Sequence, residues 1–216
     1  MTDIIYEDAD FAAINKPAGI SSIPERDLAV PCALSLLEAQ LGQKMFMVHR
    51  LDKGVSGALL FAKTAQAHRA INALFERRAV SKTYRALVHG ILESDSGEIN
   101  LPLRQFGSGR TGVDMEHGKP SLTRYELLER LKFHTLLDIR TITGRRHQIR
   151  AHLYAIGHPI AGDLRYGDRT QQSRYPRLLL HSREIVFELK PGAPIKIAAP
   201  LPEGFTQSVA RIETEF

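Results

Sequence analysis

Short apolar segments typical of β-strands follow one another along this chain, and their order constrains the fold more than any other feature. Residues 3–17, DIIYEDADFAAINKP, place two apolar runs around an Asp-rich turn and predict a hairpin. Strand-like segments that can pair with their neighbours indicate an antiparallel sheet, whereas a doubly wound fold alternates strands with helices. The later strand-like segments are residues 57–64, 82–90, 121–131, 133–143, 177–189 and 194–201.

Three stretches have helical spacing instead. Pro31 and Gly42 bracket the first, PCALSLLEAQLG, because proline is favoured in the first helical turn and glycine just past the last. The second covers residues 67–75, and the third is GRRHQIRAHLYAIG, residues 144–157. We therefore expect an α+β fold, a mixed and mainly antiparallel sheet with flanking helices, as a single domain over residues 1–216.

Composition narrows the class of protein. With 216 residues, 43% of them hydrophobic, the chain can bury a substantial core. Lys and Arg number 29 against 24 Asp and Glu, and this excess favours a polyanionic partner. Cys32 is the only cysteine, which excludes an intramolecular disulfide and a Cys-rich zinc site. The N-terminus is acidic and no apolar run approaches the roughly 18 residues of a membrane span, so we expect a soluble, cytoplasmic protein.

Asp52 permits two interpretations. It stands two residues before Gly54 in MVHRLDKGVSGALLFAKT, residues 47–64, and an Asp so placed between hydrophobic runs is ordinary turn material. If VHRLD is extended, however, Arg50 and Asp52 share one face while Leu51 points into the core. A carboxylate held by an arginine in a partly dry cleft stays ionised, which suits a nucleophile or a base.

Positively charged residues cluster at the N-terminal end of the helix expected over residues 144–157. Arg145, Arg146, His147 and Arg150 fall in its first turns, where the helix dipole disfavours positive charge. These residues either solvate a surface helix or face something negative. Arg150 lies one turn from Leu153, at the border of the apolar stripe, so we expect it to need a carboxylate or a phosphate. Asp52 is the candidate carboxylate.

Five motifs resemble the RluA family of RNA pseudouridine synthases. HRLDKGVSGALLFAK is similar to the family's motif around the catalytic aspartate, NKPAG (15–19) to its N-terminal element, and SKTYRALVHG to its tyrosine element. TGRRHQIRAHLYAIGHPIAGD is similar to the arginine-containing segment, and RLLLHS to the closing leucine strand. The motifs occur in the family's order across nearly the whole chain. The chain most resembles the short, catalytic-domain-only members, which lack an S4-type RNA-binding domain.

The resemblance implies a role for each matching residue. Asp52 becomes the nucleophile, Arg150 its ion-pair partner and Tyr84 the residue packed against the target base. Arg50 helps fill the space left by the displaced base, and Leu180 forms a wall of the pocket. Val55 stands where the family usually has threonine, so a local hydrogen bond is expected to differ. The basic residues expected to bind RNA phosphates are Lys16, Lys82, Arg85, Arg145, Arg146 and His147.

The implied reaction detaches uracil from the ribose, turns it and rejoins it through C5, without a cofactor or a metal. The partner is structured RNA, a stem-loop of ribosomal RNA, transfer RNA or both, and a monomer is expected. Residues 104–119 and 21–30 have no periodicity and predict exposed loops that close on the RNA. The residues leave open which uridine is modified, and whether Asp52 attacks the uracil ring or acts at the ribose.

Other functions fit the same residues less well. A zinc nucleobase deaminase needs paired cysteines and is excluded by the single Cys32. A nuclease could use His49 or His147, although histidines among arginines are more often phosphate contacts or structural donors. A non-catalytic basic RNA-binding module explains the charge, but gives no reason for a carboxylate beside arginines.

Overall fold

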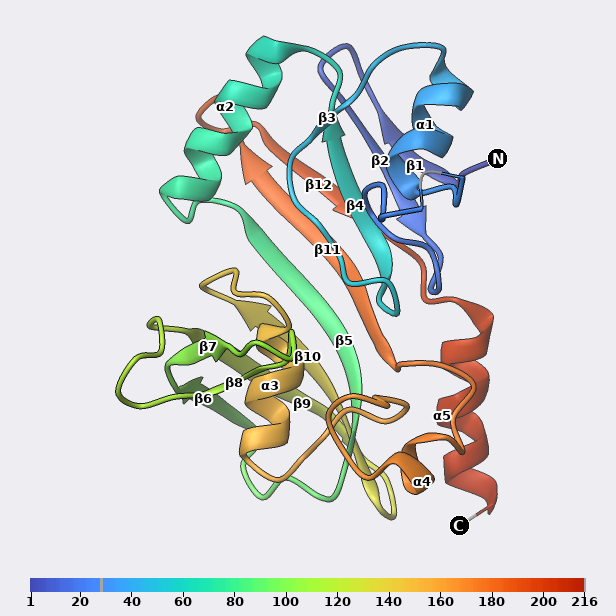
Figure 1. Cartoon of the computed structure of the whole chain (residues 1–216), viewed down its shortest axis with the longest axis vertical. Coiled ribbons are helices and arrows are strands. Elements are labelled where there is room, and N and C mark those ends of the chain that lie inside the picture. The colour runs from blue at the N-terminus through green and yellow to red at the C-terminus, as the bar shows by residue number, and fades with distance from the viewer. Residues whose placement is uncertain (28, 216) are drawn as a thin grey trace. The chain divides into compact units, whose positions relative to one another are not determined.

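The chain folds into two compact units, each built from two stretches of sequence. The computed structural model describes residues 1–27 and 29–215, the last three of these by backbone alone (Figure 1). Unit 1 comprises Met1–Lys82 and His181–Leu201, and unit 2 comprises Thr83–Leu180 and Pro202–Phe216. Leu28, within the expected loop 21–30, lies outside the described residues. In the part of the chain that is described, no helix has the length and apolar character needed to cross a membrane.

The sheet of unit 1 confirms the N-terminal and C-terminal hairpins. Its strands have the order β1-β2-β4-β11-β12, and β3 pairs with β4 as well. Neighbours are antiparallel except β4 and β11, which run parallel through His181 opposite Ser56 and Ser182 opposite Gly57. The sheet is therefore mixed, as expected. The strands are β1 (Ile4–Glu7), β2 (Phe11–Lys16), β3 (Phe46–Met47), β4 (Ser56–Ala62), β11 (Leu180–Glu188) and β12 (Pro194–Ala198).

Two helices accompany this sheet, as the spacing predicts. Helix α1 (Ala33–Leu41) begins after Cys32, whose sulfur accepts the backbone N–H of Ser35, and ends at Gly42 in the left-handed conformation. Helix α2 (Ala65–Glu76) packs against β3 and β4 (Figure 1). Its buried Ala67 and Ile71 join Phe11, Leu60 and Phe187 of the strands in one apolar cluster, so the amphipathic face becomes the core of unit 1.

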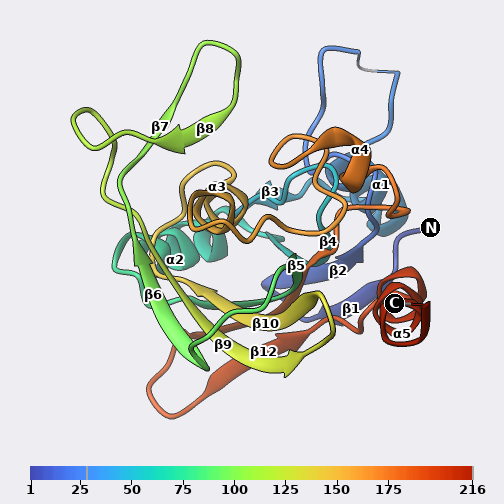
Figure 2. The same ribbon diagram turned by 90° about the horizontal axis from the view of Figure 1, so that it is seen from below.

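Unit 2 holds an antiparallel sheet of order β5-β10-β9-β6, which contains the pair predicted over residues 121–143. A separate hairpin, β7 with β8, lies beside α3 (Figure 2). The fold class, α+β with a mainly antiparallel mixed sheet, is confirmed. The elements are β5 (Ser81–His89), β6 (Ser96–Asn100), β7 (Leu103–Gln105), β8 (Thr111–Val113), β9 (Leu122–Arg130), β10 (His134–Thr141), α3 (Gln148–Ala155), α4 (Arg169–Gln172) and α5 (Glu203–Glu215).

The loop expected over residues 104–119 is wrong in part, because this segment contains β8 and most of β7. Lys119 pairs with Leu103 through two main-chain hydrogen bonds, and the N–H of Thr111 donates to the hydroxyl of Tyr166 at 2.9 Å. The hairpin is thus tied to the rest of unit 2. Strands of three residues are too short to show a two-residue periodicity in sequence, so the glycines and charges alone determined the prediction.

The start of the helix expected at residue 144 also needs correction. Arg145 and Arg146 lie in a turn before α3, and His147 occupies its N-cap position with a φ of 52°, in the left-handed region. The side-chain oxygen of Gln148 accepts hydrogen bonds from the N–H of Arg145 and the hydroxyl of Thr143 and so holds this turn. Of the four cations expected in the first helical turns, only Arg150 lies within the helix.

Gly57 is the glycine of this region that the backbone requires, with a φ of 111° at the parallel contact between β4 and β11. A Cβ atom there would overlap the main chain of Ser182. We predict that Gly57→Ala lowers the free energy of unfolding by about 3 kcal/mol through strain and overpacking.

Gly204→Ala is the matched control, since a Cβ at Gly204 of α5 meets no atom within 4 Å. It should leave stability unchanged or raise it by up to about 1 kcal/mol. Urea denaturation followed by circular dichroism measures both variants. Equal stability of the two alanine variants would contradict the close approach of β4 and β11.

Candidate active site

Asp52 occupies the first position of a β-turn. The N–H of Val55 donates to the main-chain oxygen of Asp52 at 3.0 Å, and this bond closes the turn. Leu51 is buried, Asp52 is half-buried and Arg50 is exposed, which agrees with the alternation expected for VHRLD. The hydrogen bond that closes this turn is thus a main-chain bond and does not involve the Asp52 carboxylate.

Ser22 holds the residue before Asp52. Its hydroxyl donates to the carbonyl oxygen of Leu51 at 2.8 Å and accepts the N–H of Leu51 at 3.0 Å. A hydroxyl can donate and accept at once, so one buried side chain satisfies both main-chain groups of Leu51. The backbone leading into Asp52 is thereby attached to the segment that follows NKPAG.

Lys16 holds the residue after Asp52, and its expected role as a phosphate contact is wrong. The side chain is fully buried, and its ammonium donates to the carbonyl oxygens of Pro17 at 2.9 Å, Ile20 at 2.7 Å and Lys53 at 3.3 Å. The N–H of Gly19 donates to the same Lys53 oxygen at 2.8 Å. An ammonium enclosed by carbonyl oxygens is not exposed to RNA, so NKPAG positions the Asp52 loop from within unit 1.

His49 attaches the same loop to β4. Its Nε2 accepts the N–H of Leu60 at 3.1 Å. Burial, with the nearby charge of Lys82, lowers the pKa of His49 to about 3, so the ring is neutral near pH 7. Burial also lowers the pKa of Lys82, whose ammonium lies 5.4 Å from the centroid of the Phe75 ring. His49 is therefore a structural acceptor.

Val55 is buried, and nothing in the structure accounts for valine rather than threonine there.

In unit 2, Arg150 forms a bidentate ion pair with Asp163, a residue that the sequence did not single out. Arg150 Nε lies 2.7 Å from Asp163 Oδ2, and a terminal nitrogen lies 2.8 Å from Oδ1. Asp163 Oδ1 also accepts the backbone N–H groups of Arg165 and Tyr166. The guanidinium stands 5.0 Å from the centroid of the Tyr166 ring. Arg150 is thus firmly oriented on α3.

Two further basic side chains, those of Arg85 and His147, make contacts within unit 2. Arg85 pairs with Asp138 across β5 and β10 at 2.8 Å, with both side chains mostly buried. His147 is buried, with Nδ1 3.1 Å from the hydroxyl of Tyr166. Both side chains are occupied within the protein. The expectation that these two residues contact phosphate therefore stays a prediction, and the contacts described here are internal ones.

The remaining expected site residues differ in exposure. Tyr84 and Leu180 are buried, as suits residues that pack rather than bind phosphate. Arg50, Arg145 and Arg146 are exposed. Of the cations expected to meet RNA, these three arginines have exposed side chains and Lys82 is half-buried.

Comparison with known proteins gives a consistent result. Residues 10–155 match the family model described as RNA pseudouridylate synthase. The chain is 40% identical over 189 residues to the dual-specificity RNA pseudouridine synthase RluA of Pasteurella multocida, covering 86% of each protein. It is 41% identical over 192 residues to the ribosomal large subunit pseudouridine synthase C of Vibrio parahaemolyticus, covering 86% of this chain and 61% of that one. The solved structure of human RNA pseudouridylate synthase domain containing 1 matches with a TM-score of 0.80 and 26% identity, covering 99% of this chain and 95% of that one.

The Asp163–Arg150 pair predicts a large effect on stability. The Asp163 side chain is 0% exposed and that of Arg150 12%, and removing one partner of a buried pair leaves the other uncompensated. We expect Asp163→Asn to lower the free energy of unfolding by about 3 kcal/mol. Asp95→Asn is the matched control: it breaks an exposed pair with Arg130 and should cost less than about 1 kcal/mol. Similar losses in urea denaturation would contradict the internal role of Asp163.

His49 predicts a pH dependence. The unfolded chain protonates this ring below about pH 6.5, whereas the folded chain does so only near pH 3, so stability falls as the pH drops between these values. His49→Gln keeps an acceptor for the Leu60 N–H but does not titrate. The slope of unfolding free energy against pH should decrease by up to about 1.4 kcal/mol per pH unit. Urea midpoints from pH 7 to pH 4 measure this slope, and identical slopes in parent and variant would refute the assignment.

Proposed function

This chain belongs to the RNA pseudouridylate synthase family, and we propose that it isomerises specific uridines of structured RNA through Asp52 as the nucleophile. It is an RNA pseudouridine synthase, an isomerase. The family match over residues 10–155 includes the Asp52 loop and Arg150. The finer assignments below rest on the geometry of each unit and on the motifs that resemble the family.

The reaction breaks the bond between N1 of uracil and C1′ of ribose and forms a bond between C5 and C1′. The proton on C5 leaves and N1 gains a proton, so there is no net oxidation or hydrolysis. A carboxylate serves as a covalent nucleophile by forming one bond and later releasing it. The proposal covers attack on the uracil ring or at the ribose, because a carboxylate oxygen forms the adduct in both cases.

One observation carries the assignment of Asp52: the main chain is held on both sides of it. Ser22 binds both main-chain groups of Leu51, and Lys16 and Gly19 bind the carbonyl oxygen of Lys53. A catalytic side chain needs a supporting shell that fixes its position. A turn that needed only an Asp side chain would not require three additional attachments, so this arrangement supports a chemical role for the half-buried carboxylate.

The other roles follow from the resemblance and from the exposure of each residue. Arg150 is proposed as the ion-pair partner of Asp52, with Asp163 holding its guanidinium. Tyr84 is proposed to pack against the target base and Leu180 to form an apolar wall. The exposed residues proposed to contact RNA are Arg50, Arg145 and Arg146. The half-buried Lys82 is proposed to have the same role.

The substrate is proposed to be a stem-loop of ribosomal RNA, transfer RNA or both. The names of the relatives support this class, since one is a dual-specificity synthase and another a ribosomal large subunit synthase. We propose that residues 1–216 act as one catalytic domain, because Asp52 belongs to unit 1 and Arg150 to unit 2. The active form is proposed to be a monomer.

Asp52→Asn tests the proposal, because asparagine keeps the shape and the turn but removes the negative charge. Release of tritium from RNA labelled at C5 of uracil should fall to background in this variant. The affinity for RNA should stay within about tenfold of the parent, about 1.4 kcal/mol, since phosphate contacts lie on other residues. Filter binding and thermal melting of the same preparation measure affinity and folding.

Asp3→Asn is the matched control, an exposed carboxylate of unit 1, and should release tritium at the parent rate. Release near the parent rate by a verified Asp52→Asn preparation would return Asp52 to a turn-forming role. If the parent protein bound RNA but released no tritium, the alternative of a non-catalytic basic RNA-binding module would be favoured.

A further inference from the structure

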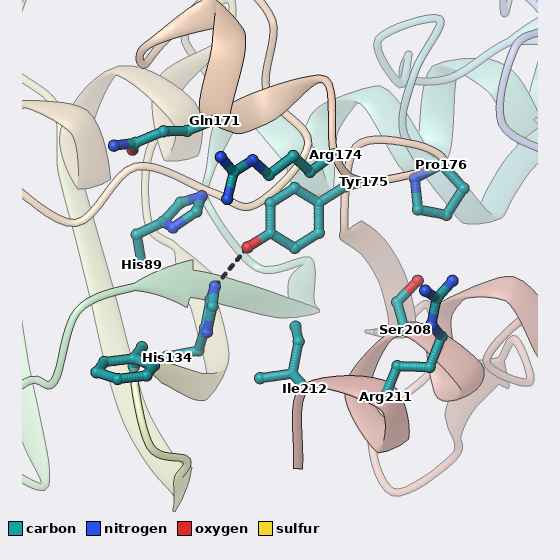
Figure 3. Close-up of a pocket in the computed structure, with 10 residues that line it drawn as sticks. His89, His134, Gln171, Arg174, Tyr175, Pro176, Ser208, Arg211 and Ile212 are labelled. Atoms are coloured by element: carbon teal, nitrogen blue, oxygen red, sulfur yellow. Dashed lines mark hydrogen bonds between the residues drawn. The ribbon is translucent and has the colours of Figure 1, made fainter. Parts of the chain in front are cut away.

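Unit 2 contains a cavity of about 510 Å³ that none of the roles above uses. Three parts of unit 2 form it: the end of β5 with the start of β10, residues 171–176 at and after the end of α4, and one face of α5. Figure 3 shows His89, His134 and Tyr175 close together, with Ser208, Arg211 and Ile212 approaching from α5. Its volume lies within the range of small-molecule sites, roughly 300–1,000 Å³.

Planar rings dominate one wall of this cavity. The His89 ring centroid lies 4.9 Å from that of His134 and 5.4 Å from that of Tyr175. Nε2 of His134 is 2.6 Å from the Tyr175 hydroxyl, the contact drawn in Figure 3. Phe133, which is exposed, adds a further ring. These side chains offer flat surfaces on which another aromatic ring can stack.

The wall also contains an unsatisfied polar group. Nδ1 of His134 is buried and has no hydrogen-bond partner among the described residues. Burial, with the neighbouring His89, lowers the pKa of His134 to about 4, so the ring is neutral near pH 7. A buried polar atom without a partner is uncommon in a folded protein and calls for an explanation. Because Nδ1 is shielded from solvent, it shows that a neutral polar ring lies beside the cavity, and the proposal below rests on the other contacts of the lining.

The charged residues described in the lining of this cavity are all basic. Arg174 and Arg211 both line it and both are exposed, while its described lining includes no Asp or Glu. A guanidinium matches the geometry of phosphate oxygens and stacks on aromatic faces. The combination of rings and arginines therefore favours a planar aromatic ligand that carries an anionic group.

We propose that this cavity binds a nucleotide, with its base against the rings of His89 and Tyr175 and its phosphate on Arg174 and Arg211. The proposal does not depend on the role of Asp52, because it concerns a separate set of residues within unit 2. The same chemistry is offered by a free mononucleotide and by one nucleotide of a bound RNA. The experiment below distinguishes these two sources.

One contact determines which residues are suitable for the test. Oε1 of Gln172 accepts the N–H of Gly162 at 2.7 Å and that of Asp163 at 3.2 Å, and it lies 3.3 Å from Nε2 of His89. An amide oxygen can only accept hydrogen bonds, so Nε2 of His89 is the donor in this contact. Changing His89 or Gln172 would therefore disturb the residues that hold Arg150. The test leaves both intact and changes residues 174, 175 and 211.

Adenosine 5′-monophosphate is the first probe, titrated into the full chain by calorimetry, with adenosine and inorganic phosphate as its two fragments. Saturable binding is expected, tighter for the nucleotide than for either fragment. Arg174→Ala, Arg211→Ala and Tyr175→Leu should each weaken it by about tenfold. Arg69→Ala is the matched control, since it removes an equal charge from an exposed position of α2 in unit 1 and should leave binding unchanged.

A substrate stem-loop carrying 4-thiouridine separates the two sources. If the ligand is a nucleotide of RNA, irradiation should cross-link the RNA to the peptide containing residues 171–176, and excess mononucleotide should reduce the cross-link. If the ligand is a free nucleotide, calorimetry gives the result above and this cross-link is absent. Two results would overturn the proposal: no saturable binding of the mononucleotide together with no cross-link, or binding that the three pocket variants leave unchanged. Thermal melting of each variant verifies that it is folded.

Discussion

A lysine ammonium removed from water must be surrounded by oxygen atoms, and this requirement organises the candidate site in unit 1. Lys16 satisfies it with the carbonyl oxygens of Pro17, Ile20 and Lys53. The first two lie in the segment that also carries Ser22, and the third belongs to the residue after Asp52. Burial of one charge thus joins two separate stretches of chain, and Ser22 completes the attachment at Leu51. Asp52 lies between these two fixed points.

Unit 2 uses a buried carboxylate in the same way. Asp163 orients the guanidinium of Arg150 and binds the backbone of Arg165 and Tyr166, while Gln172 secures its own N–H. A carboxylate with this many donors is held in one position. Each unit therefore presents one candidate catalytic residue on a scaffold whose rigidity comes from an internal charge. The strength of these buried contacts, rather than the number of surface charges, sets the positions of Asp52 and Arg150.

The sequence predicted the strands and helices whose apolar periodicity extends over several residues, such as β4, α2 and the β9–β10 pair. It did not predict β7 and β8, because three residues carry too little periodicity, or the late start of α3, which depends on a left-handed His147 held near Tyr166. Asp52 and Arg150 were singled out by the charges around them in sequence, and the resemblance to a family then implied their roles. Asp163 was not, since a Gly-Asp pair in sequence cannot be distinguished from an ordinary turn.

Burial explains why positive charge alone was a poor guide to the RNA-binding surface. The excess of lysine and arginine correctly favoured a polyanionic partner. Lys16, however, donates to main-chain carbonyl oxygens, and Arg85 forms an ion pair with Asp138. The sequence shows the charge of a side chain but not the group that will bind it in the folded protein. Such a group can lie far along the chain or can be a main-chain oxygen. Arg145 and Arg146 remain exposed for a structural reason: Gln148 folds the chain before α3 into a turn. The exposed arginines are therefore the ones proposed to contact RNA, and the three-dimensional structure distinguishes them from the buried cations.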